Sequence, residues 1–207
     1  PLQVDNPIHA LAKFVAATTT VPEHWESYIF SGGVPSREAA GGLVSSPTPG
    51  AVLTYDAGTD VYTYTFATNI NNVAAATYTE GDTIRIGFQV TTYVAPNVTP
   101  TFDMTNGAAD FVSASAAVAP TTHQREIVTI DACNACHGKL AVHGRRVETR
   151  YCVTCHNLGL VEGGLTGDLG PFVHKNHGRE KLTSPSYQSW LPGIANSTRF
   201  RAESRRA

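Results

Sequence analysis

The sequence lacks several features that define other classes of protein. It contains no run of about 18 apolar residues, so neither a membrane-spanning helix nor a signal peptide is expected within it. Its 207 residues include 4 cysteines, too few for a disulfide scaffold. Lys and Arg form no continuous basic run, so nucleic acid is not an expected partner. The chain begins at Pro1 without a methionine, and we expect a processed or trimmed product.

Charge is divided unevenly along the chain. Residues 1–124 hold 3 Lys or Arg against 10 Asp or Glu, whereas residues 125–207 hold 12 against 7. All four cysteines lie in the basic part. The length allows one or two domains, and the hydrophobic fraction of 42% is ordinary for a globular protein. We therefore expect one domain at residues 1–122 and a different segment at residues 123–207.

The first part is expected to be a mainly β domain. In residues 60–68, small β-branched residues alternate with Tyr62, Tyr64 and Phe66, which is the period of a strand. Residues 51–55 precede this strand across a turn-rich sequence, so the two predict a hairpin. Residues 84–90 predict a third strand, and weaker candidates are residues 12–17, 27–30, 101–104 and 110–114. The pattern favours an Ig-like or Greek-key sandwich, or a split barrel.

Residues 123–207 have a different character. They are rich in glycine and have few apolar residues with any periodicity, so we expect a loop-rich domain with little regular secondary structure. Such a segment could hardly bury enough apolar surface to fold alone. A large apolar prosthetic group would supply the missing core.

This segment carries two copies of a Cys-x-x-Cys-His sequence, the attachment signature of c-type haem. Two thiols one turn apart can form thioethers with the two vinyl groups on one porphyrin edge, and the adjacent histidine becomes an axial ligand of the iron. The sequence thus predicts two covalently bound haems c. The haem-binding residues are Cys133, Cys136 and His137 in the first motif, and Cys152, Cys155 and His156 in the second.

A zinc site is the main alternative at these cysteines. The 15 residues between Cys136 and Cys152 also match the spacing of a four-cysteine zinc site, which would make the chain a zinc-stapled binding module. A zinc site has no need of a histidine directly after each cysteine pair. Haem is therefore preferred, with zinc, redox or disulfide pairs left open.

The second axial ligand decides the class of haem chemistry. Met104, the single methionine, lies in the β-rich part, so histidine is the expected ligand. Two histidines on each iron leave no open position for a substrate, which favours electron transfer over catalysis. A haem enzyme with one open iron, a reductase or a peroxidase, is the alternative. The candidate distal ligands are His143, His174 and His177, with weaker candidates at His123, His9 and His24.

Three strong candidates for two irons leave one histidine spare. We expect His143 and one of His174 and His177 to serve the two local haems. The spare ring would reach a third haem from elsewhere or hydrogen-bond a propionate. If His174 and His177 share a helix, their rings lie on one face.

Several segments resemble the outer-membrane decahaem cytochromes of the OmcA/MtrC type. The two motifs with their neighbours are similar to the start of the first haem domain of that family, and Val173-His174-Lys175-Asn176-His177-Gly178 is similar to its paired-histidine segment. Residues 62–68 and 84–89 resemble strands of the β domain that precedes it.

The resemblance implies extracellular electron transfer at the outward face of a bacterial outer membrane, with a periplasmic place as the other option. Metal oxides or flavins would be acceptors, and other redox proteins or further haem-bearing subunits would be partners. A homo-oligomer or filament is compatible with it. We expect the chain to be an N-terminal portion of such a cytochrome, or a small relative that works in an assembly.

Overall fold

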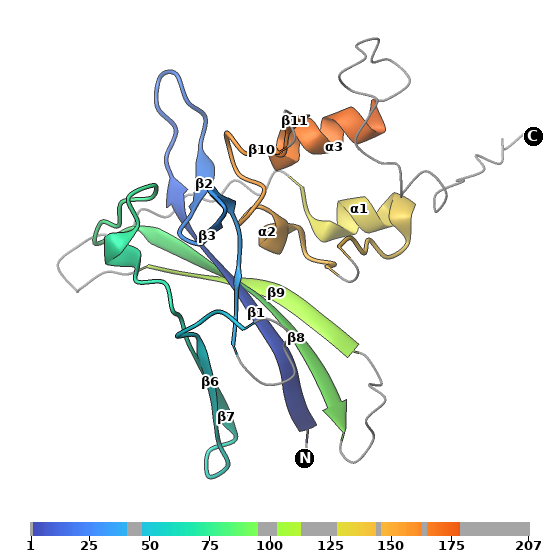
Figure 1. Cartoon of the computed structure of the whole chain (residues 1–207). Helices are drawn as coiled ribbons and strands as arrows, with labels where there is room; N and C mark the ends of the chain where they lie inside the picture. The colour runs from blue at the N-terminus through green and yellow to red at the C-terminus, as the bar shows by residue number, and fades with distance from the viewer. Residues whose placement is uncertain are drawn as a thin grey trace, which may run out of the picture.

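The computed structural model describes residues 2–40, 47–94, 103–112, 128–143, 146–162 and 165–178. Its largest unit is a five-stranded antiparallel sheet in which β1 lies at the centre, in the order β2-β1-β8-β9, with β5 also paired to β1 (Figure 1). The strands are β1 (Leu2–Val15), β2 (His24–Ser27), β5 (Glu38–Ala39), β8 (Thr83–Val94) and β9 (Asp103–Val112).

Smaller elements surround this sheet. The β6–β7 hairpin extends away from it, as Figure 1 shows. No closed barrel is formed by the strands that the structure describes, and the mainly β prediction is confirmed. The remaining elements of this part are β3 (Phe30–Ser31), β4 (Val34–Pro35), β6 (Val52–Asp56), β7 (Val61–Thr65) and the short 3₁₀ helix η1 (Ile70–Asn72).

The clearest strand predictions are confirmed and the weaker ones are imprecise. The hairpin of β6 and β7 and the strand β8 lie where the alternation placed them. Residues 12–17 cover only the end of β1, and residues 27–30 cover the end of β2 and the start of β3.

The two weak strand candidates at residues 101–104 and 110–114 have the wrong bounds. Residues 103–112 form one strand, β9, which pairs with β8 without interruption, while residues 101–102 and 113–114 lie outside the described residues. Within this strand, the Phe88 ring covers Gly107 so closely that a Cβ there would lie 2.8 Å from it. The glycine makes room for a side chain within a continuous strand.

One face of the sheet covers an apolar core. Its buried members are Leu11, Tyr28, Ile29, Ala76 and Ile84, with Phe66, Ile70, Val73, Tyr78 and Ile86 packed against them. The carboxylate of Glu38, 1% exposed, accepts hydrogen bonds from the amides of Ala67 and Thr68 at 2.9 and 2.8 Å. These bonds fix the end of the β6–β7 hairpin to the sheet.

The opposite face of β8 is also buried. Arg85, Gly87 and Gln89 alternate with the core residues along the strand, and all three are buried. Helix α2 (Thr149–Cys152) lies over this face, next to β8 and β9 (Figure 1). The cysteine-rich segment therefore packs directly on the sheet.

The cysteine-rich segment has more regular structure than the sequence suggested. Besides α2 it contains α1 (Ile130–His137), α3 (Leu169–His177) and a short hairpin of β10 (Val161–Glu162) with β11 (Leu165–Thr166). The predicted boundary at residue 122 lies outside the described residues. Across the parts of the chain that are described, no helix has the length and apolar character needed to span a membrane.

Candidate haem-binding site

The first motif lies on helix α1. The Thr129 hydroxyl caps the helix by accepting a hydrogen bond from the Ala132 amide, and Gly138 ends it with a φ of 68°. Because Cys133 and Cys136 are three residues apart on this helix, their thiols lie on one face. Cys136 and His137 are exposed and Cys133 is half-buried. The motif is thus held by its own helix.

The second motif begins where α2 ends and continues as a turn. The amides of Cys155 and His156 both donate to the Cys152 carbonyl, at 3.2 and 2.9 Å. The Cys152 thiol donates to the Glu148 carbonyl at 3.3 Å, and the Cys155 thiol donates to the Ser36 carbonyl of the β domain at 3.2 Å. Burial raises the pKa of Cys152 to about 11, so it is held as a neutral thiol.

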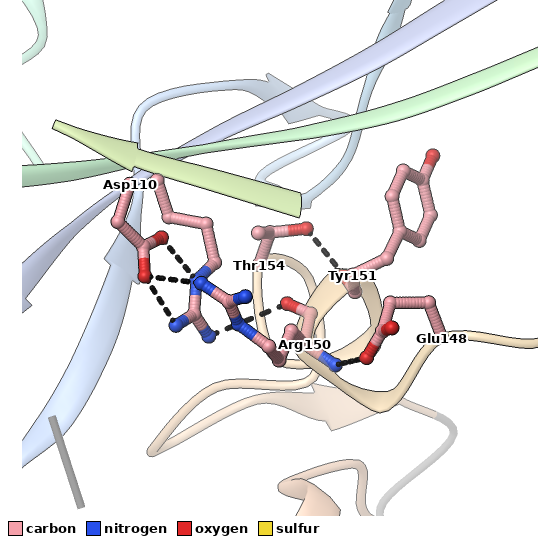
Figure 2. A network of polar contacts seen from close by, with 6 residues as sticks. Asp110, Glu148, Arg150, Tyr151 and Thr154 are labelled. Atoms are coloured by element: carbon pink, nitrogen blue, oxygen red, sulfur yellow. Dashed lines mark hydrogen bonds and ion pairs between the residues drawn. The ribbon is translucent and has the colours of Figure 1, made fainter. Parts of the chain in front are cut away.

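An ion-pair network fastens α2 to the sheet, as Figure 2 shows. The Asp110 carboxylate on β9 accepts two bonds from Arg85 on β8, at 2.7 and 2.9 Å, and one from Arg150 on α2, at 2.6 Å. The Arg85 side chain is 4% exposed and also lies 4.0 Å above the centre of the Trp25 ring. Because bidentate arginine–carboxylate pairs fix geometry, this network sets the position of α2.

Tyr151 packs beside this network on a row of small residues. Gly87 pairs with Ala10 on one side and Ala108 on the other. These three small residues form a strip across β1, β8 and β9 that leaves room for a large side chain. A Cβ at Gly87 would lie 2.6 Å from the Tyr151 ring. Close packing of this aromatic side chain thus requires glycine at residue 87.

The structure brings the histidines together in two pairs. The rings of His143 and His156 lie 5.8 Å apart between centroids at an interplanar angle of 22°. The rings of His137 and His177 lie 5.9 Å apart at 87°. Each pair joins the histidine of one motif to one of the three candidate distal ligands.

Two of these rings are oriented by backbone carbonyls. Nδ1 of His156 lies 2.7 Å from the Gly167 carbonyl, and Nδ1 of His177 lies 2.9 Å from the Val173 carbonyl. A ring that donates from Nδ1 leaves Nε2 as an electron-pair donor, which is the usual arrangement of a metal-ligating histidine. His174 lies exposed on α3, the same helix that carries His177.

The remaining histidines do not join these pairs in the described structure. His9 stacks on Tyr64 with 3.8 Å between ring centroids, and Nδ1 of His24 lies 2.8 Å from the Pro22 carbonyl. His123 lies outside the described residues.

A four-cysteine zinc site does not form among the described residues, which include all four cysteines. No group of three or more His, Cys, Asp or Glu side chains in the described ranges is arranged to hold a metal ion. Cys133 and Cys136 lie on α1, whereas Cys152 ends α2 and Cys155 lies in the turn that follows it. The geometry therefore favours two separate motifs over one zinc centre.

Sequence reasoning missed the residues that attach the second motif to the β domain. Asp110, Arg85 and Gly87 carry no motif, and each fits an ordinary alternating strand. One signal was present: an aromatic residue, Tyr151, directly precedes the second motif, where the first has Ala132.

Comparison with known proteins gives a consistent result. Residues 125–202 match the family described as outer membrane cytochrome MtrC/MtrF-like, domains II/IV. The multihaem cytochrome MtrC of Shewanella baltica is 32% identical over 149 residues, which is 70% of this chain and 22% of that protein.

Two solved structures share the fold. The crystal structure of MtrC from Shewanella baltica has a TM-score of 0.62 and 27% identity, over 87% of this chain and 28% of that one. The outer-membrane decahaem cytochrome OmcA has a TM-score of 0.57 and 24% identity, over 83% of this chain and 27% of that one, and supports the fold alone. The chain spans less than a third of each protein that it matches here.

Proposed function

The chain is related to the outer-membrane multihaem cytochromes of the MtrC and OmcA type, and from this relationship we propose that it binds two haems c and carries electrons. The first haem is attached at Cys133 and Cys136 and the second at Cys152 and Cys155. A bound haem supplies a reversible one-electron iron centre. The protein's part is to hold it, orient its ligands and limit access by water.

We propose that His137 and His177 would hold one haem iron, and that His156 and His143 would hold the other. The single observation that carries this assignment is the ring spacing of 5.9 and 5.8 Å. Two imidazoles that share one metal through bonds of about 2 Å have ring centres about 6 Å apart. The side chains present therefore fit two bis-histidine haems.

Bis-histidine ligation would make the chain an electron carrier. A haem iron held by two of these histidines would have no open position for a substrate, so reductase or peroxidase turnover at the iron is not proposed. The Gly167 carbonyl holds the His156 ring in one orientation, which limits the structural change on electron transfer. His174 is left for a haem outside this pair of motifs or for a propionate.

The proposed location is the outward face of a bacterial outer membrane. This rests on the matching family, which is described as outer membrane cytochrome MtrC/MtrF-like. Other redox proteins or haem-bearing subunits are the proposed partners, and metal oxides or flavins are the proposed acceptors. Many haems in sequence are the usual means of moving electrons over distance, and two neighbouring motifs would form one segment of such a path.

The haem-loaded chain gives a direct test. Intact mass and a pyridine haemochrome spectrum are expected to report two covalent haems c, and electron paramagnetic resonance is expected to report two low-spin irons. Haem lost on denaturation, or stoichiometric zinc in its place, would contradict the proposal.

The ligand assignment is tested by three matched variants. His143→Ala and His177→Ala are each expected to convert one iron from low spin to high spin. His174→Ala, on the same helix as His177, is the control and is expected to leave both irons low-spin. The pairing is wrong if His174→Ala removes a low-spin signal and His177→Ala does not.

A further inference from the structure

The Tyr151 hydroxyl is buried without a hydrogen-bond partner among the described residues. The residue as a whole is 2% exposed. Burying a hydroxyl without a partner is unfavourable, so native structures usually supply one from protein, water or a ligand. The buried Tyr151 hydroxyl therefore indicates a hydrogen-bond acceptor that the polypeptide alone does not provide.

The position of Tyr151 limits what that group can be. The residue directly precedes Cys152, the first attachment point of the second motif. Its ring is fixed against Gly87, and Figure 2 shows the hydroxyl directed away from Asp110 and Arg150. The ion-pair network consequently does not satisfy it.

Two cations act on Tyr151. The Arg146 guanidinium lies 5.4 Å from the centre of the Tyr151 ring and is held there by a 3.0 Å bond from its Nε to Gln89. Burial raises the pKa of Tyr151 to about 12, while the positive charges of Arg146 and Arg37 act in the opposite direction. A hydroxyl donor beside two arginines is suited to an anionic acceptor.

Two other buried tyrosine hydroxyls lack a partner among the described residues, those of Tyr28 and Tyr64, and they differ in charge environment. Burial raises the pKa of both, and the neighbouring carboxylates, Asp82 and Glu26 at Tyr28 and Glu38 at Tyr64, act in the same direction. An anion is disfavoured at these two sites. Of the three, Tyr151 is the one suited to a carboxylate.

We propose that the Tyr151 hydroxyl donates a hydrogen bond to a haem propionate, with Arg146 as the adjacent cation. This inference rests on the proposed attachment of haem at Cys152 and Cys155. That haem is fixed to the next residue in the chain and brings two carboxylates with it. Tyr151 then has two roles, because its ring packs on the β sheet and its hydroxyl binds the cofactor.

The test compares Tyr151→Phe with Tyr28→Phe in the haem-loaded chain. Both variants remove one buried hydroxyl and keep the ring. Loss of the donor leaves more uncompensated negative charge near one iron, which favours the ferric state. Spectroelectrochemistry is expected to show a shift of one midpoint potential to a lower value in Tyr151→Phe, with both potentials unchanged in Tyr28→Phe.

The number of covalently bound haems distinguishes a failure of the proposed function from a failure of the inference about Tyr151. A wild-type chain without covalent haem overturns the proposed function and this inference together. Two haems with unchanged potentials in Tyr151→Phe overturn this inference alone.

If Tyr151→Phe loads haem poorly, a crystal structure of the wild-type haem-loaded chain decides the matter. A phenolic oxygen within about 3 Å of a propionate oxygen supports the inference. A hydroxyl bonded to water or to another protein group overturns it.

Discussion

The two Cys-x-x-Cys-His motifs differ in what holds them in place. The first lies on α1, with an exposed Ala132 before it and an exposed Gly138 after it. The second has buried residues at the same positions, Tyr151 and Asn157, and a buried Thr154 within the motif. The same chemical signature thus occurs once as a self-contained helix and once as part of the contact with the β sheet.

The two motifs share the same attachment residues but differ in the contacts that position them. Both motifs supply two thiols and a histidine, but only the second, in the described residues, has a thiol bonded to the β domain. The second site is therefore expected to depend on sheet residues far away in the sequence, and the first is not. Substitutions on either side of this contact test the comparison.

The largest effect is expected for Tyr151→Ala. Removing the ring leaves a cavity on the strip of Ala10, Gly87 and Ala108 and should lower the free energy of unfolding by about 3–5 kcal/mol. Chemical denaturation followed by circular dichroism measures it. The matched control is Ala132→Gly at the same position of the first motif, expected to cost about 1 kcal/mol. Similar losses for both would show that the two motifs are held alike.

Asp110→Asn is expected to have the next largest effect. The neutral side chain leaves the buried Arg85 guanidinium without its counter-charge and weakens the bond to Arg150, which should cost about 2 kcal/mol. Thermal denaturation at fixed ionic strength measures the loss. Asp56→Asn, at an exposed turn in the β6–β7 hairpin, is the control and is expected to change stability by less than about 0.5 kcal/mol. A loss at Asp110 no larger than this would show that the network does not position α2.

Gly87→Ala should cost about 1–2 kcal/mol, because the new methyl group would meet the Tyr151 ring. Hydrogen exchange localises the effect: the amides of Cys155 and His156 are expected to exchange faster, and the α1 amides to stay unchanged. Gly170→Ala is the control, since a Cβ there meets its nearest atom, an Asp168 carboxylate oxygen, at 3.9 Å. Faster exchange in both motifs would mean that the sheet supports both.

The smallest effect is expected for Thr129→Ala, which removes the cap of α1. The loss of about 1 kcal/mol should be confined to that helix, because the cap bond is local. Faster exchange of the Cys136 and His137 amides measures it, and the amides of Cys155 and His156 serve as internal controls. A change in the second motif would contradict the independence of α1.

Local patterns in the sequence predicted local structure well. Alternation identified the β6–β7 hairpin and β8, because successive side chains of a strand point to opposite faces and give the sequence a period of 2. These features depend on neighbours within a few residues.

Contacts between distant segments could not be predicted in this way. Arg85 reads as the polar side of a strand, and nothing nearby shows that Arg150, 65 residues later, covers it. The proposed choice of His177 over His174 as a ligand likewise depends on where α3 lies relative to His137. Identical ligand types at adjacent helical positions carry no information on that point.

If haem is attached at the second motif as proposed, the two thiol hydrogen bonds of that motif imply an order of events in maturation. The Cys152 and Cys155 thiols donate to the Glu148 and Ser36 carbonyls in the folded polypeptide. A thioether sulfur has no hydrogen, so neither bond survives attachment of a porphyrin. Once the motif is packed against Ser36, the Cys155 sulfur is also shielded from a large incoming reactant. Covalent attachment is therefore expected to precede packing, with the β sheet closing over a motif that already carries its cofactor.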